Sequence, residues 1–132
     1  MNDLKDAWTA RDRSLVAEKA YLLLQQGRCQ EAEILLDGLL AIDPQNRYCR
    51  LALATVWVAQ GDLRKAVEQF DRLITFYPND IEIRTRRCEA YLRLNWLREA
   101  KADLGWLKQV TGGEQIGRLQ LLIEVDPLKS QE

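Results

Sequence analysis

The strongest structural signal in this chain is RYCRLALATVWVAQGDLRKAVEQFDRLITFYPND, residues 47–80. Apolar residues recur at helical spacing on both sides of Gly61, and the stretch closes at Pro78. Glycine lets a chain turn back at the end of a helix, and proline stops the second helix because it cannot donate the next hydrogen bond. Ala66 is small, so two helices can approach closely beside it. The stretch therefore predicts a hairpin of two antiparallel helices.

The pattern of this hairpin recurs every 34 residues. Ala66 has counterparts at Ala32 and Ala100, and a second glycine lies at Gly27. A single match of this kind is weak evidence, but here apolar, turn and helix-ending positions recur in phase. The further registers are Leu23, Trp57 and Tyr91; Leu36, Phe70 and Leu104; Leu39, Leu73 and Leu107; and Pro44 and Pro78. The sequence therefore predicts three copies of one helical hairpin.

The hairpin resembles the tetratricopeptide (TPR) repeat, whose period is about 34 residues. The match consists of Arg50, Leu53, Ala54 and Trp57 on the first helix, Ala66 and Phe70 on the second, and Pro78 after it. Ala54 stands where the family signature has glycine. The resemblance extends over residues 13–114. It implies an all-α fold, a short right-handed α-solenoid of three TPR hairpins with an N-terminal lead-in helix and a C-terminal capping helix.

The repeat phase divides the chain into segments. They are a helical lead-in at 1–12, three TPRs at 13–46, 47–80 and 81–113, a capping helix at 114–126 and a tail at 127–132. Asn2 or Asp3 can cap the lead-in, and Ser14 is only a weak cap for the first helix of repeat one. Alternatively, the lead-in runs straight into that helix, because no Gly or Pro separates them. The capping helix is out of phase with the repeats, so we expect it to cover the exposed end of repeat three. Its apolar face contains Ile116, Leu119, Leu122 and Ile123.

The third repeat departs from the pattern. Asn95 replaces the turn glycine, which is tolerable because asparagine accepts left-handed backbone better than most residues. Arg87 stands where repeat two has Leu53, and we expect its stem to lie along apolar surface with its charge in water. The arginines of this repeat interleave with acidic residues, which predicts a solvated, salt-bridged face; an acidic partner segment is the alternative. These arginines are Arg84, Arg86, Arg87, Arg93 and Arg98.

Composition limits the classes of function. The chain has 132 residues, of which 47% are hydrophobic and 30% charged, which predicts one soluble domain or one short solenoid. The net charge of −1, with no long run of one sign, argues against nucleic acid as a partner. The N-terminus is too charged for a signal peptide, and no apolar run approaches the roughly 18 residues of a membrane span. We therefore expect a cytoplasmic protein.

The chain offers little chemistry for catalysis. It contains no histidine, which removes histidine-based triads, the commonest general base and most zinc sites. Cys29, Cys49 and Cys88 are odd in number and far apart, and they are typical of reduced thiols. There is no phosphate-binding loop, no metal-ligand spacing and no nucleophile with a base. We therefore expect no catalytic residue, no metal and no cofactor, and a protein that is not an enzyme.

The candidate binding site is a groove. Stacked hairpins curve, and the first helix of each pair lines the concave side. A stripe on these helices recurs at the 34-residue period and contains Ala17, Tyr21, Leu24, Tyr48, Leu51, Thr55, Val58, Thr85, Glu89 and Leu92. We expect the two tyrosines to anchor an extended or helical peptide with an apolar segment. Leu24 and Leu51 can instead belong to the core between repeats.

Two further features bear on the partner. TPR domains that hold the C-terminal carboxylates of heat-shock chaperones use Lys and Asn on this groove face. This chain has Ala17, Tyr21, Leu51, Thr55, Thr85 and Glu89 at the equivalent places, so apolar capture is favoured over carboxylate clamping. Trp8 and Trp106 are candidates for a secondary contact, either a partner or a homodimer. For Trp106, packing against the final helix is the alternative.

Among TPR families, the chain resembles the chaperones of bacterial type III secretion. The resemblance rests on the segment GRCQEAEILLDGLLAIDP, residues 27–44, on the groove of tyrosines and aliphatic residues, and on the helical lead-in and capping helix. It implies capture of an apolar export substrate before secretion, with no nucleotide used. The competing hypothesis is an assembly scaffold, or a subunit that oligomerises through its outer surface.

Overall fold

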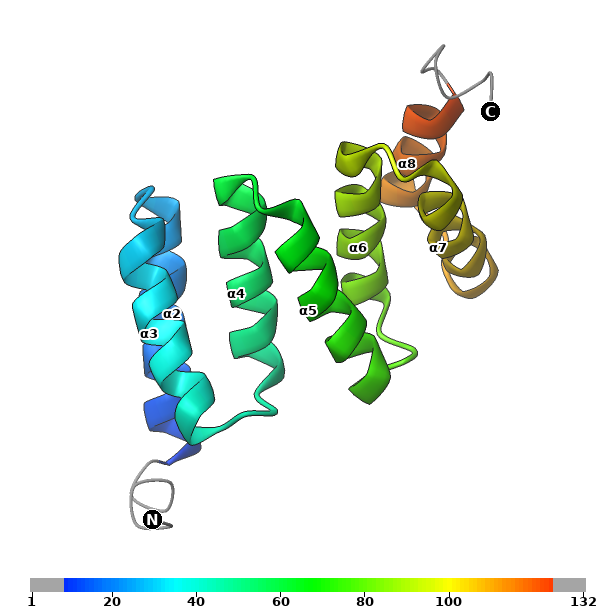
Figure 1. Ribbon diagram of the computed structural model, residues 1–132. Helices are drawn as coiled ribbons and strands as arrows, with labels where there is room; N and C mark the ends of the chain where they lie inside the picture. The colour runs from blue at the N-terminus through cyan, green and yellow to red at the C-terminus, as the bar shows by residue number, and fades with distance from the viewer. Residues whose placement is uncertain (1–8, 125–132) are drawn as a thin grey trace. The chain divides into compact units, whose positions relative to one another are not determined.

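The computed structural model describes residues 9–124, which fold into seven α-helices and contain no strand (Figure 1). The helices, labelled as in Figure 1, are α2 Ala10–Gln25, α3 Cys29–Ile42, α4 Arg47–Gln60, α5 Leu63–Phe76, α6 Ile81–Leu94, α7 Leu97–Val110 and α8 Glu114–Glu124. The predicted all-α helical-repeat fold is confirmed. None of the helices within these residues is both long and apolar enough to cross a membrane.

The ends of the helices follow the predicted period. Gly27, Gly61 and Asn95 have φ of 77°, 84° and 61°, so all three turns use the left-handed conformation. The starts of α4 and α6 follow the same period. The side chain of Asn46 accepts a hydrogen bond from the Cys49 amide at 2.9 Å. The side chain of Asp80, 34 residues later, caps α6 in the same way.

Helix α2 begins earlier than the sequence predicted. Thr9 and Asp12 form a capping box, because Asp12 N donates to Thr9 Oγ1 (3.1 Å) and Thr9 N donates to Asp12 Oδ2 (2.9 Å). These two reciprocal bonds satisfy amides that a cap at Ser14 would leave to water. Helix α2 is continuous across residues 12 and 13, as expected if the lead-in runs straight into the first helix of repeat one. The lead-in predicted at Asn2, Asp3 and Trp8 lies outside the described residues.

The chain forms two compact units, residues 1–62 and 63–132. The division falls at the turn after α4, within the stretch predicted as repeat two. In the first unit, α2, α3 and α4 pack on one another. Their shared core includes Ala20, Ala32, Leu36, Leu39, Cys49, Ala52 and Val56. Ala32 is fully buried, as expected of a small residue where two helices approach closely.

In the second unit, α6 packs against α5, α7 and α8, and α8 also packs against α7. The predicted capping helix thus covers the last hairpin. Ile116, Leu119 and Ile123 are buried, but Leu122 is 45% exposed, so its placement on the buried face was wrong. Leu122 precedes Ile123 by one residue, a rotation of about 100° around the helix, which turns its side chain out of the core.

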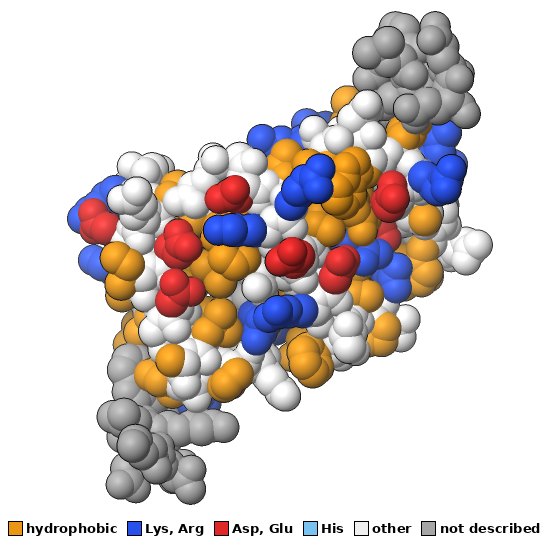
Figure 2. Space-filling model, viewed as in Figure 1, with side chains coloured by type: hydrophobic (Ala, Val, Ile, Leu, Met, Phe, Trp, Pro, Cys, Tyr) orange, Lys and Arg blue, Asp and Glu red, His pale blue; other side chains and the backbone are white. Residues whose placement is uncertain are grey.

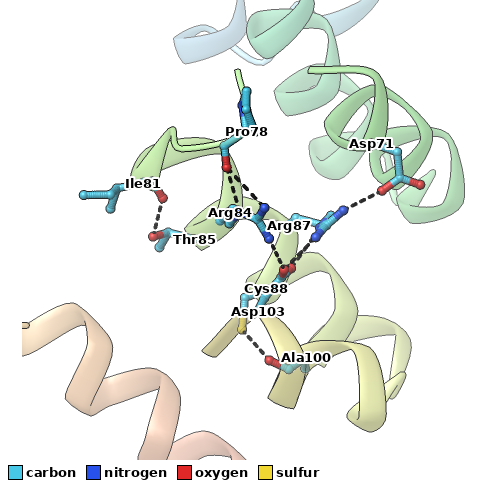
Figure 3. A network of polar contacts seen from close by, with 9 residues as sticks. All are labelled: Asp71, Pro78, Ile81, Arg84, Thr85, Arg87, Cys88, Ala100 and Asp103. Carbon is cyan, nitrogen blue, oxygen red and sulfur yellow. Dashed lines mark hydrogen bonds and ion pairs between the residues drawn. The ribbon is translucent and has the colours of Figure 1, made fainter. Parts of the chain in front are cut away.

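The prediction for Arg87 was also wrong, because its charge does not lie in water. Arg87 Nε and Nη2 donate to the carboxylate of Asp103 at 2.9 and 2.6 Å (Figure 3). Arg87 Nη1 donates to Asp71 Oδ1 at 2.9 Å. Asp103, on α7, is 2% exposed, so one arginine of α6 links a buried acid on α7 to an exposed acid on α5.

Arg84 belongs to the same network. Its Nη1 lies 3.6 Å from Asp103 Oδ1, and its Nε and Nη2 donate to the carbonyl of Pro78 at 3.2 and 3.1 Å (Figure 3). The guanidinium carbon of Arg84 also lies 4.4 Å from the centre of the Trp106 ring. Two of the arginines predicted to form a solvated face therefore take part in the internal structure of the second unit. On the face seen in Figure 2, basic and acidic side chains are interspersed.

Candidate functional site

The first unit contains a hollow of about 530 Å³ on the side of α2 and α4. Ala10, Ser14, Ala17 and Tyr21 follow one another along α2 at steps of four, three and four residues, which places them on one face of that helix. We call this site the tyrosine hollow. Its lining is Ala10, Arg13, Ser14, Ala17, Glu18, Tyr21, Asp43, Asn46 and Tyr48.

Two aromatic rings and several small side chains contribute to the lining of this hollow. Tyr48, in the first turn of α4, is 64% exposed, which makes it the more accessible of the two tyrosines. Tyr21 is half-buried and packs against the core of the first unit. Ala17 is 9% exposed and contributes only a methyl group to the lining. The predicted residues Ala17, Tyr21 and Tyr48 therefore line one hollow.

The rim of the tyrosine hollow is polar and internally paired. Arg13 Nε lies 3.5 Å from Asp43 Oδ2, and Asn46 Nδ2 donates to the same oxygen at 3.3 Å. The guanidinium carbon of Arg47 lies 5.6 Å from the centre of the Tyr48 ring. Arg13 and Asp43 offset each other, and Glu18 leaves the lining with a small excess of negative charge beside its aromatic and small apolar surface. That surface is suited to apolar side chains of a polypeptide.

Other members of the predicted stripe in the first unit lie elsewhere. Leu51 is 2% exposed, so it is a core residue and does not offer a surface to a partner. Leu24 is half-buried against the core of the unit. The hydroxyl of Thr55 donates to the Leu51 carbonyl at 2.9 Å, within its own helix. Val58 is half-buried, and neither it nor Leu24 lines the tyrosine hollow.

In the second unit, a separate hollow of about 350 Å³ lies between α6 and α8, and we call it the α6–α8 hollow. Its lining is Glu89, Leu92, Arg93, Gln115, Arg118, Leu119 and Leu122. The predicted residues Glu89 and Leu92 are therefore brought together with the final helix. Thr85 is buried, and its hydroxyl donates to the Ile81 carbonyl at 2.8 Å. The sequence placed Thr85 on the stripe that lines the groove, but its burial leaves it little surface to offer a partner.

The predicted secondary contact is only partly described. Trp106 is half-buried and lies under the guanidinium of Arg84. Trp8 lies outside the described residues. Cation–π stacking of this kind stabilises the ring where it stands and covers part of its face. Trp106 is therefore less accessible than Tyr48.

Sequence reasoning missed several residues that line the two hollows. Asp43 and Asn46 belong to the connection between α3 and α4, where the sequence predicts only the end of a helix. Gln115, Arg118 and Leu122 come from α8, which was treated only as a cap. A stripe drawn on the first helices of the repeats cannot reach either set. The pairing of Arg13 with Asp43 had no signal in the sequence, because the residues are 30 positions apart.

Comparisons with known proteins agree with this geometry. The tetratricopeptide repeat family model matches residues 23–85. A search of curated proteins finds no significant match. Among solved structures, a tetratricopeptide repeat protein from Parabacteroides merdae is 19% identical, with a TM-score of 0.77 over 86% of this chain. This chain spans 45% of that protein.

Two smaller solved structures match over most of both chains. The Yersinia enterocolitica type III secretion chaperone SycD, in complex with a peptide of the translocator YopD, is 16% identical, with a TM-score of 0.79; the match covers 92% of this chain and 97% of that one. The first TPR domain of Spaghetti (RPAP3), bound to the HSP90 peptide SRMEEVD, is 19% identical, with a TM-score of 0.75 and coverage of 87% and 93%. Residues 23–85 therefore carry tetratricopeptide repeat sequence, within helical hairpins that recur at a 34-residue period.

Proposed function

We propose that this TPR protein is a non-catalytic chaperone that captures an apolar peptide segment of a partner in the tyrosine hollow. The observation that carries the proposal is the meeting of Tyr21, Tyr48 and Ala17 around one hollow of about 530 Å³. Tyrosines supply large contact area at a low cost in side-chain entropy, because the ring has only two rotatable bonds. A bulky side chain over Ala17 and between the two rings would bury apolar surface on three sides.

The chemistry of the tyrosine hollow favours an apolar segment over a terminal carboxylate. Its nearest cation, Arg13, is already 3.5 Å from Asp43, and its α2 face offers methyl, hydroxyl and phenol groups. A carboxylate would have to compete with Asp43 for the guanidinium at a solvent-exposed rim, where ion pairs contribute little. The HSP90 peptide bound by the RPAP3 domain is therefore a poor guide to the ligand of this chain.

The finer proposal concerns the biological setting. SycD matches this chain in fold and in length, and its structure holds a peptide of a translocator. At 16% identity this likeness supports the fold alone, so the secretion role rests on the sequence resemblance of residues 27–44. We propose that the chain acts in the cytoplasm and keeps an apolar segment of an export substrate from aggregating until it is delivered. No nucleotide would be needed.

The test compares two exposed aromatic residues. Tyr48→Ala removes an anchor of the tyrosine hollow, while Phe76→Ala removes a ring that is 51% exposed on α5 and outside that hollow. Apolar peptides without Asp or Glu, selected on the wild-type protein, would be titrated by fluorescence anisotropy against both variants. We expect Tyr48→Ala to weaken binding at least tenfold and Phe76→Ala to leave it within twofold. Equal affinities for all three proteins would exclude the tyrosine hollow as the binding site.

A scaffold or homodimer is the second candidate, because aliphatic side chains are exposed on the outer surface of the first unit. Ile34 on α3 is 71% exposed and Leu22 on α2 is 53% exposed. Light scattering separates the candidates. A mass that stays monomeric across concentration, in a protein that binds peptide, supports the chaperone. An obligate oligomer whose mass falls in an Ile34→Glu variant supports the scaffold.

A further inference from the structure

The α6–α8 hollow combines an aliphatic floor with basic side chains. Leu92 is half-buried, Leu119 is buried and Leu122 is 45% exposed, so the floor is partly open to solvent. Arg93 on α6 and Arg118 on α8 line the same hollow. In Figure 1, α8 stands beside the final hairpin, to which α6 belongs. The hollow therefore presents apolar surface and positive charge to the same ligand.

The acidic residue of this hollow is already engaged. Glu89 accepts a hydrogen bond from Gln115 Nε2 at 3.0 Å, which links α6 to α8 across the hollow. The lining contains two arginines and this one carboxylate, so it carries an excess of positive charge. This excess contrasts with the tyrosine hollow, whose lining contains one arginine and two carboxylates. The two hollows differ in the sign of their charge, and we expect them to select different ligands.

Other arginines of α6 take part in ion pairs within the second unit. Arg84 and Arg87 are held by Asp103, Asp71 and the Pro78 carbonyl on the side of α5 and α7. Arg86 pairs with Glu82 at 3.5 Å on its own helix. Arg93 lies one turn or more beyond these residues, at the end of α6 that lines the hollow. Arg118, on α8, is exposed and brings a second guanidinium to the lining.

We infer that the α6–α8 hollow is a second docking site, and that its occupant is a partner segment in which an aliphatic or aromatic side chain is flanked by Asp or Glu. The apolar side chain would lie on Leu92, Leu119 and Leu122, and its acidic neighbour would approach Arg118. Arginine is suited to this role because its planar fork binds a carboxylate through two hydrogen bonds. The site is built from the second unit and is separate from the tyrosine hollow.

The probe is a random dodecapeptide library displayed on phage and selected on the full chain. We expect one class of selected peptides to carry Asp or Glu within three residues of Leu, Ile, Met or Phe. Synthetic peptides of this class should bind Arg118→Glu at least tenfold more weakly than the wild type. Arg72→Glu, the same charge change at an exposed position of α5, should change affinity less than twofold. Affinity should also fall as NaCl rises from 50 to 300 mM.

A second variant distinguishes a loss of the binding surface from a loss of the fold. Leu122→Ser removes exposed apolar surface from the floor and should weaken the same peptides several-fold with an unchanged far-UV CD spectrum. Tyr48→Ala should leave them unaffected, which separates this site from the tyrosine hollow. The inference is overturned if no selected peptide is sensitive to Arg118→Glu, if the sensitive peptides are not acidic, or if Arg72→Glu causes the same loss. If acidic peptides bind only after residues 125–132 are deleted, the occupant is the chain's own C-terminal segment, and an external partner is excluded.

Discussion

We expect the loss of the Asp103 side chain to lower the stability of the second unit substantially. Asp103 is 2% exposed and accepts two hydrogen bonds from Arg87, while Arg84 lies 3.6 Å away. Removing one partner of a buried pair leaves the other charge without compensation, at a cost of about 3 kcal/mol or more. We therefore expect Asp103→Ala to lower the free energy of unfolding by about 3 kcal/mol. Urea titration followed by far-UV CD measures it.

Asp71→Ala is the matched control, because Asp71 bonds to the same guanidinium from an exposed position. Ion pairs of this kind contribute about 0–1 kcal/mol, so the loss should be small. If the two variants were equally destabilised, the burial of Asp103 would have no energetic consequence and the network would be a surface feature. A stable Asp103→Ala variant would lead to the same conclusion.

The three cysteines should differ in reactivity. Burial raises the pKa of Cys49 and of Cys88 to about 12, and their thiols donate to the carbonyls of Leu36 and Ala100. Cys29 is half-buried. Since the thiolate is the reactive form, a thiol reagent at pH 8 should modify Cys29 first and reach the other two only on unfolding. Rapid native modification of two or three thiols would contradict this.

The same two thiols give the protein a pH dependence with a definite sign. Their pKa values are raised in the folded state, so unfolding releases protons once the pH exceeds the ordinary thiol value of about 8.5. Their contribution to stability is complete below that pH and is lost as the pH rises toward 12. We expect the urea midpoint to fall between pH 9 and 11, and to fall less in a Cys49→Ala variant, measured relative to its own value at pH 7.

Two glycines test whether local backbone preferences determine where the helices end. Gly61 lies in the turn after α4, and Gly105 lies inside α7. Gly61 has φ of 84° and no atom within 4 Å of an added Cβ, so alanine would meet backbone strain alone. We expect Gly61→Ala to cost about 1 kcal/mol. Gly105 lies inside α7 with equally open surroundings, and alanine there should stabilise by about 0.5–1 kcal/mol. Thermal unfolding of both variants checks the opposite signs. Stabilisation by both would show that the turn after α4 does not require left-handed backbone.

The same local signals explain how much of the fold could be predicted. Turn residues, buried alanines and the Pro78 ending act over a few residues, so the helices from α3 onward were placed close to their observed bounds. The start of α2 was missed because its capping box, Thr9 and Asp12, lies outside the repeat phase. The pairing of Arg87 with Asp103 was missed because it joins two helices, and a pattern on one helix does not contain it.

For the molecule as a whole, the candidate site could be predicted only in part. Tyr21, Tyr48 and Ala17 were placed on one stripe and do share a hollow. Leu51 and Thr85 belong to the same stripe but are buried, because the face that lines a groove also borders the core on either side. Where one role ends and the other begins depends on the packing of neighbouring helices. Periodicity in one sequence does not determine this boundary.

The central claim is that a partner segment lies against Tyr48 in the tyrosine hollow. The most direct measurement is site-specific photocrosslinking in the full chain, with benzoylphenylalanine in place of Tyr48 or, as the control, in place of Phe76. Peptides selected on the wild-type protein would be irradiated with each variant and the adducts located by mass spectrometry. The account predicts an adduct through an apolar residue of the peptide at position 48 and none at position 76. Adducts at position 76 alone, or equal yields at both positions, would contradict it.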